Sequence, residues 1–157
     1  MATFIKYDCF VSDLCGKVHD ILGTTPGSDC DRLKIALSNT AGDVAVTKSV
    51  YSACHEITPG HGYTADGLPT GSNGLNSGAV AGSGPTTFTL TGTNQVWTAS
   101  GGNIGPFQYI LLYNFTAASV PLIGAWDYGS ALTLASGETF TVKFNNGALS
   151  GTILTIV

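Results

Sequence analysis

The sequence reads TFTVKFNNG from Thr139 to Gly147, and this stretch decides the fold class. Apolar side chains occupy every second position from Phe140 to Phe144, which is the period of a strand with one buried face. Asn145-Asn146-Gly147 follows and is the strongest hairpin turn signal in the chain. The stretch therefore predicts a strand that turns back into an antiparallel partner, which residues 149–157 supply.

Short apolar segments and tight turns extend from this hairpin back to about residue 86. They predict further strands at residues 88–90, 96–97, 107–113, 119–126 and 132–134. Strands at this spacing are typical of antiparallel sandwiches and barrels. We therefore predict a mainly β fold, an antiparallel β-sandwich of the jelly-roll or Greek-key type, with its β-rich core at residues 86–157.

The N-terminal segment has a different period. From residue 4 to residue 22, nearly all large apolar side chains fall within an arc of about 120° of a helix. Gly23 provides a stop signal, and Pro26-Gly27 indicates a turn. We expect one N-terminal amphipathic helix, residues 4–22, packed on the β-sheet core.

The segment between the helix and the β-rich core is less regular. Residues 33–37 alternate like a strand, residues 45–53 predict a weaker strand, and residues 55–67 indicate a loop. Residues 64–86 are rich in Gly, Ser, Thr and Asn and predict a flexible loop or an extended arm. The 157 residues together have the size of a single domain, 1–157.

Charge is scarce and unevenly placed. Only 10% of the residues are charged, against about 25% in an ordinary protein. After Asp66 only Asp127, Glu138 and Lys143 carry a charge. A β-rich half without charge is poorly protected against association, and interface cores are depleted in charge in the same way. We interpret the neutral half as a surface that meets another subunit; the alternative is a stable monomer coated with Thr, Ser and Asn.

The net charge and the lengths of the apolar runs also exclude some classes of partner. The net charge of −4 argues against nucleic acid, which is bound by basic surfaces. The longest apolar runs, such as residues 109–113, are far too short to cross a membrane, and the N-terminus has no readable signal peptide. We therefore expect no nucleic acid and no membrane as partner, and synthesis in a cytoplasm.

The four cysteines, Cys9, Cys15, Cys30 and Cys54, contain no C-x-x-C pair. On the predicted helix Cys15 lies beside the apolar arc, so we expect it to be buried. Cys9 points to the polar side and is the candidate for a disulfide between subunits, formed after release into an oxidising medium. The alternative is that all four are free thiols without a role.

Residues for catalysis or metal binding are not grouped in any known motif. His55-Glu56 with His61 is the only cluster that suggests a metal, but Pro59-Gly60 prevents the helix that an H-E-x-x-H site needs. Nucleophile elbows and phosphate-binding loops are missing from the sequence. We predict no catalytic site, no cofactor and no metal, and a protein that is not an enzyme.

Several aromatic residues offer a different reading, a platform for sugars. These are Trp97, Tyr109, Tyr113, Trp126 and Tyr128. Aromatic residues in strands more often belong to the core or to cross-strand pairs. We expect these five to be mainly core residues.

The order of five segments resembles a family of small virion proteins of tailed bacteriophages. The segments are FVSDLCGKVHDIL (10–22), DRLKIALSNTA (31–41), EITPGHGYTADG (56–67), GGNIGPFQYILLYN (101–114) and PLIGAWDYGSALTLASGETFTVKF (121–144). The resemblance implies a structural role in the particle, as a decoration or cement protein on the outer surface of the capsid. Its partners would be the major capsid protein and copies of itself, with a trimer as one arrangement. The cysteines are not part of the pattern.

Two hypotheses of different classes follow for the function. The first is capsid decoration. The second is a tail-fibre or receptor-binding module that recognises host glycans through exposed aromatic residues. The number of copies in each particle separates the two, because a capsid lattice needs hundreds and a tail only a few.

Overall fold

The computed structural model describes residues 2–21, 30–69, 74–81, 88–144 and 150–156. Strands account for 49% of the residues and helices for 11%, and every strand pair is antiparallel. The prediction of a mainly β fold with one α-helix is therefore confirmed. The predicted β-sandwich is not confirmed, because the sheets are small and do not close on one another.

The strands form three sheets, two of which continue one another. In chain order the elements are β1 (Thr3–Lys6), α1 (Cys9–Cys15), β2 (Leu33–Ser38), η1 (Ala41–Val44), η2 (Tyr51–Ala53), β3 (Asn76–Ala81), β4 (Phe88–Thr93), β5 (Gln95–Thr98), β6 (Ile104–Asn114), β7 (Leu122–Leu134), β8 (Thr139–Val142) and β9 (Ser150–Ile156).

The main sheet has the order β1-β7-β6-β2. Its centre is the long hairpin of β6 and β7, in which Leu111 lies opposite Ala125. Residues 109–114 of β6 are all buried, although neighbouring side chains of a strand point to opposite faces. The sheet must therefore be covered on both sides, which explains why residues 109–113 are continuously apolar.

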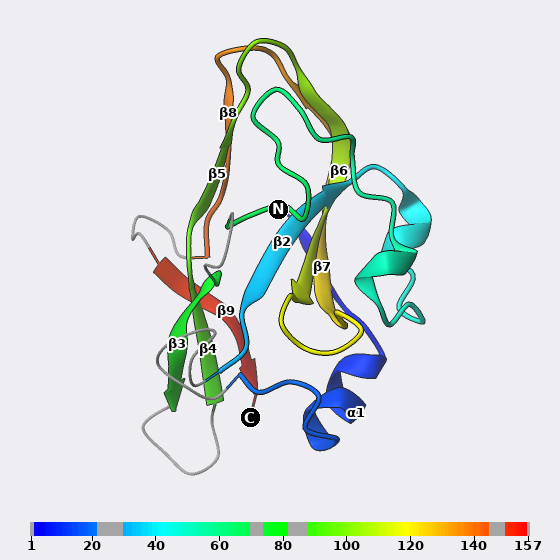
Figure 1. Ribbon diagram of the computed structural model, residues 1–157, viewed down its shortest axis with the longest axis vertical. Coiled ribbons are helices and arrows are strands. Elements are labelled where there is room, and N and C mark those ends of the chain that lie inside the picture. The colour runs from blue at the N-terminus through cyan, green and yellow to red at the C-terminus, as the bar shows by residue number, and fades with distance from the viewer. Residues whose placement is uncertain (1, 22–29, 70–73, 82–87, 145–149, 157) are drawn as a thin grey trace.

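The second layer is a bent ribbon (Figure 1). The strands β4 and β5 follow one another with only Asn94 between them; β4 pairs with β3 and β9, and β5 pairs with β8. Figure 1 shows β5 and β8 rising beside the upper part of the main sheet, and β3, β4 and β9 lying at its lower end. The two layers enclose the larger hydrophobic core, to which β2, β4, β5, β6 and β7 all contribute.

A smaller core lies on the other face of the main sheet. Tyr7, Leu111 and Tyr113 are buried there beneath the two 3₁₀ turns, η1 and η2, and Tyr51 stacks on Tyr113 with ring centroids 4.0 Å apart. Residues 41–54 thus form a cover for this face. The sequence had suggested a strand for residues 45–53, and that prediction is wrong.

Backbone hydrogen bonds join the two layers on the β2 side. Ile35 and Leu68 exchange two bonds of 2.8 Å, and Leu75 N–H donates to the carbonyl of Leu33 at 2.7 Å. Thr93 N–H then donates to the carbonyl of Leu75 at 2.9 Å, which connects β2 to β4. Gly67 makes the approach possible: it has φ +64°, and a Cβ there would lie 2.0 Å from the Ile35 carbonyl oxygen.

These contacts correct the prediction of a flexible loop or extended arm at residues 64–86. Leu75 is fully buried and residues 76–81 form β3, so these parts of the segment belong to the fold. Residues 70–73 and 82–87 lie outside the described residues, as does the predicted turn at 145–147. The predicted strands at 33–37, 88–90, 96–97 and 107–113 are confirmed.

The predicted helix at residues 4–22 is largely wrong. Residues 3–6 form β1, and α1 covers only Cys9–Cys15. Lys17 takes a left-handed conformation with φ 58°, and Val18 N–H closes the helix by donating to the Asp13 carbonyl at 2.8 Å. The helix prediction failed because Phe4 and Tyr7 are three positions apart. That spacing places two side chains on the same face of a helix but on opposite faces of a strand. The predicted stop at Gly23 lies outside the described residues.

Packing of the short helix can be tested by two neighbouring substitutions. Phe10 is 4% exposed in the main core, whereas Val11 beside it is 50% exposed. We expect Phe10→Ala to lower the free energy of unfolding by about 3–5 kcal/mol, through lost burial and the cavity left behind. Val11→Ala should change it by less than about 1 kcal/mol. Urea unfolding followed by circular dichroism measures both; equal midpoints for the two variants would contradict the packing.

Candidate interaction surface

An apolar groove of about 470 Å³ opens on the side of the molecule where β1 and β9 lie. It lies between the main sheet and the second layer, opposite the side that Leu68 and Leu75 join. Its lining residues come from β1, α1, β7 and β9: Phe4, Lys6, Phe10, Val11, Leu14, Cys15, Ile123, Leu154, Thr155 and Ile156. We call this the β1–β9 groove.

The alternation of β1 turns two side chains into the groove. Tyr7 lies in the smaller core, so Phe4 and Lys6, an odd number of positions away, lie on the opposite face of the strand. The Phe4 ring rests on β7, where a Cβ at Gly124 would come within 2.6 Å of it. The ring also packs on Trp126, with centroids 5.3 Å apart. A glycine on the neighbouring strand therefore fixes the position of Phe4.

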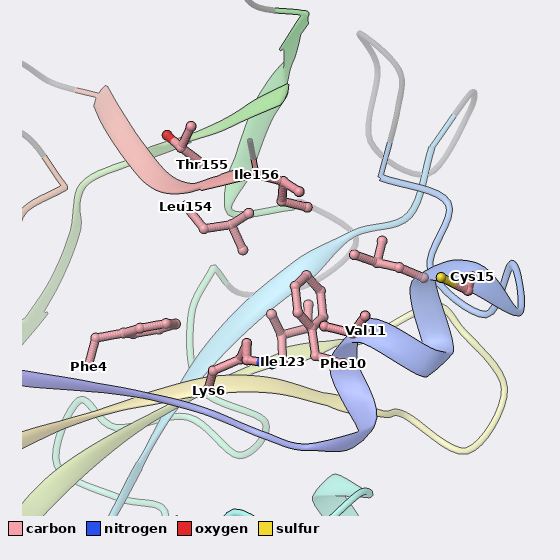
Figure 2. A pocket seen from close by; sticks show the side chains of 10 residues that line it. Phe4, Lys6, Phe10, Val11, Cys15, Ile123, Leu154, Thr155 and Ile156 are labelled. Carbon is pink, nitrogen blue, oxygen red and sulfur yellow. The ribbon is translucent and has the colours of Figure 1, made fainter. Parts of the chain in front are cut away.

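The helix forms the second wall and β9 the third (Figure 2). Figure 2 shows the side chains of Phe10 and Ile123 on one side of the groove, and those of Leu154 and Ile156 reaching toward it from β9 on the other. Phe10 belongs to the buried core, whereas Val11, one residue further, stays at the rim. The groove is thus an opening of the main core toward the surface.

Exposed apolar side chains gather at this groove. The described residues include seven large hydrophobic side chains that are exposed, and three of them line it: Phe4 at 43%, Val11 at 50% and Ile156 at 38%. Single exposed apolar residues are ordinary, but a contiguous apolar patch marks a place where another molecule binds. The three come from three different elements, so only the fold brings them together.

Lys6 is the only charged side chain among the described residues that line the groove. It is exposed, and the part of the chain that the structure describes offers it no ion pair. A lone lysine beside apolar walls favours a binding partner that supplies a carboxylate.

The strands at both sides of the groove are edge strands. β1 is the last strand of its sheet and β9 is the last strand of its own. Tyr7 N–H donates to the Ile123 carbonyl, and antiparallel pairing alternates, so the backbone groups of Phe4 and Lys6 point away from β7. An edge of this kind is a template for a further strand.

Comparison of the chain with family models, curated proteins and solved structures finds no match. The function of the chain therefore has to be argued from its own surface, and the resemblance to phage virion proteins remains a proposal.

The histidines that suggested a metal have separate roles. His55 donates its backbone N–H to Asp43 Oδ2 at 2.7 Å, and its Nδ1 lies 3.0 Å from Asp43 Oδ1. Glu56 instead accepts a bond of 2.6 Å from the Tyr63 hydroxyl. His61 is exposed in a turn at φ 55°. Among the described residues no three His, Cys, Asp or Glu side chains form a metal-binding group.

Asp43 is the polar residue that the sequence did not reveal. It is fully buried, and its carboxylate also accepts bonds from Ser38 Oγ at 2.6 Å and from Lys48 Nζ at 2.8 Å. Its backbone carbonyl accepts a bond from the Tyr7 hydroxyl at 2.6 Å. These hydrogen bonds of Asp43, which we call the Asp43 cluster, hold the cover segment, residues 41–54, against the main sheet.

The cysteines lie differently from the prediction. Cys15, expected to be buried, is exposed at the rim of the groove, and that expectation is wrong because α1 is shorter and its apolar side is centred on Phe10. Cys9 is half-buried, with its sulfur 3.5 Å from the Leu122 carbonyl. Cys30 is buried and Cys54 half-buried, and none of the four forms a disulfide. Burial, and after it the nearby Asp13, raises the pKa of Cys9 to about 11.

The aromatic residues largely follow the core interpretation. Trp97, Tyr109 and Tyr113 are buried, as expected. Trp126 is half-buried and Tyr128 is 48% exposed. These two line a hollow of about 200 Å³ beside Phe140 and Phe144, next to the groove. No feature of the sequence separates these two from the three buried residues.

Acid provides a test of the Asp43 cluster. Burial by itself raises the pKa of Asp43, but the hydrogen bonds from Lys48, Ser38 and His55 outweigh it and lower the pKa to about 2. Because the pKa of Asp43 is lower in the folded than in the unfolded chain, the ionised carboxylate stabilises the fold fully above about pH 4. This stabilisation is lost as the pH falls through about 2. As the pH falls from about 4 to about 2, we expect the free energy of unfolding of the wild type to decrease by about 2 kcal/mol more than that of Asp43→Asn. Asp8→Asn, at an exposed aspartate, is the control; parallel stability curves for wild type and Asp43→Asn would contradict the cluster.

Thiol labelling tests the positions of the cysteines. A thiolate is the reactive form, so burial and a raised pKa slow the reaction. We expect a small maleimide at neutral pH to modify Cys15 first, and Cys9 about 10–100 times more slowly than in the chain unfolded by urea. Mass spectrometry of digested samples locates the label, and Cys15→Ser is the control. First labelling at Cys9 would show that the helix is turned differently.

Proposed function

We propose that the protein is a non-enzymatic structural protein of a bacteriophage virion, and that it decorates and stabilises the outer surface of the capsid. The observation that carries the proposal is the β1–β9 groove, an open apolar surface bordered by two edge strands. A cement protein works through contact area, so it needs such a surface and no reaction chemistry. Its partners are the major capsid protein and further copies of itself.

The scarcity of charge supports the same function. The last ninety residues of the chain contain only three charged side chains, Asp127, Glu138 and Lys143. Asp127 accepts a bond of 2.9 Å from Gln108 and one of 2.7 Å from Gly129 N–H, and Glu138 accepts one of 2.8 Å from Ala135 N–H. Two of the three therefore hold local structure. The rest of this half is a neutral surface of the kind that subunit interfaces use.

The finer fold belongs to this proposal too. Two antiparallel layers that share one core support a β-sandwich of the jelly-roll or Greek-key type as the parent architecture. In the described residues no helix has the length and hydrophobicity needed to span a bilayer. Cytoplasmic synthesis, location on the virion and a disulfide between subunits through Cys9 remain parts of the proposal.

A second candidate function rests on the aromatic hollow beside the groove. Trp126, Tyr128 and Phe140 line it, and Tyr128 meets Phe140 edge to face with centroids 5.9 Å apart. Half-exposed aromatic rings with a lysine, Lys143, at the rim are compatible with a carbohydrate. A tail-fibre or receptor-binding module is therefore the alternative function.

Copy number tests the two functions. We expect denaturing electrophoresis of purified particles to show the protein at hundreds of copies, in a fixed ratio to the major capsid protein. A handful of copies would favour the tail, and absence from the particle would contradict both. Omitting the reductant tests the disulfide on the same particles: a ladder that Cys9→Ser removes supports the crosslink, whereas one that only Cys15→Ser removes assigns it to Cys15.

A further inference from the structure

The β1–β9 groove is one part of a longer seam. At one end the Phe4 ring contacts Trp126, which lines the aromatic hollow of about 200 Å³. At the other end Leu14 and Ile156 line both the groove and a further hollow of about 230 Å³. The three hollows follow the chain in order, from Ala2 to Ile21. A seam of this shape fits an elongated occupant and not a compact one.

The backbone at the seam indicates what kind of elongated occupant it is. Among the described residues nothing pairs with the groups of Phe4 and Lys6 that face away from β7, so these groups form an open sheet edge. Asp8 N–H, further along, is already bonded to the Val46 carbonyl at 2.9 Å. The open edge is therefore Thr3–Lys6, which is enough for one short strand. A strand added here turns alternate side chains toward the groove, where the walls are apolar.

Lys6 favours a segment of another protein over a second copy of this chain as the occupant of the groove. Two copies paired through β1 around a two-fold axis would bring two Lys6 side chains, without carboxylates among the lining residues, into one apolar interface. An edge lysine is a feature by which proteins prevent such pairing. A foreign segment with an acidic side chain opposite Lys6 fits both the apolar walls and the charge.

We propose that the β1–β9 groove binds an extended arm of another protein, which adds a strand to the β1 edge, places apolar side chains in the groove and pairs a carboxylate with Lys6. The inference deepens the proposed function and rests on its premise that the chain packs against other subunits. The arm must be unpaired in its own protein, since a strand already held inside a sheet cannot enter the groove. It is thus a terminal or loop segment of the partner.

Synthetic peptides provide the test. The probes are fluorescent peptides of about nine residues, a normal strand length, which alternate valine with threonine and carry a central glutamate or a central lysine. We expect the wild type to bind the glutamate peptide about two to five times more tightly than the lysine peptide, as for a cross-strand ion pair. Lys6→Glu should reverse this order. Fluorescence polarisation measures the four affinities.

Matched variants locate the binding site. Val11→Glu places a charge in the groove and should weaken both peptides at least about ten-fold, whereas Val96→Glu changes a valine that is equally exposed, 51% against 50%, but lies on β5. Ile156→Glu, on the opposite wall, repeats the test if Val11→Glu unfolds early. Hydrogen exchange should show new protection of the Phe4 and Lys6 amides when the glutamate peptide binds, because strand addition gives them partners.

Several results would overturn the inference. The inference is wrong if neither peptide binds with a Kd below about 1 mM, or if Lys6→Glu leaves the order of the two affinities unchanged. It is also wrong if binding survives both Val11→Glu and Ile156→Glu, or if the Phe4 and Lys6 amides gain no protection. A dimer in sedimentation that Val11→Glu abolishes would assign the groove to a second copy instead. Particle assembly separates this inference from the proposed function. If the glutamate peptide binds but the protein is absent from the particle, the proposed function alone is refuted. If the Val11→Glu variant is incorporated into the particle normally, the role of the groove alone is refuted.

Discussion

Burial of the β6–β7 hairpin on both faces determines how the other elements are arranged. A strand buried on one face can leave the other in water, but residues 109–114 have water on neither side. The chain must therefore provide two covers for one sheet. The bent ribbon of β4, β5, β8 and β9 covers one face with an apolar core, and the irregular segment of residues 41–54 covers the other.

The two covers are held in different ways. The ribbon contributes large apolar side chains such as Leu90, Trp97 and Ile153, so burial of apolar area holds it in place. The cover segment is short and has few such residues, and it is held by the buried carboxylate of Asp43. A buried charge is costly unless its hydrogen bonds are satisfied. Here Ser38, Lys48 and His55 satisfy it, so the carboxylate fixes the position of the segment as well as adding stability.

The groove follows from the same architecture. The ribbon is joined to the main sheet through Leu68 and Leu75 on the β2 side, and it diverges from the sheet at the β1 side, where β1 and β9 are both edges. The core therefore reaches the surface there, with Phe4, Val11 and Ile156 at its rim. An opening of this kind exposes apolar area to water unless another chain covers it. The proposed structural role in an assembly would account for this opening.

From the sequence we could predict the mainly β class, most of the strands in the second half and the burial of Trp97, Tyr109 and Tyr113, because a two-residue period and turn residues act over a few neighbours. The tertiary structure was needed to place residues 3–6 in the sheet, because pairing with β7 stabilises four residues whose local pattern equally suits a helix. It also brought Phe4, Val11 and Ile156 to one groove and placed Asp43 beneath the cover segment. These features depend on contacts between residues far apart in the chain, such as Phe4 and Trp126, and no local period records them.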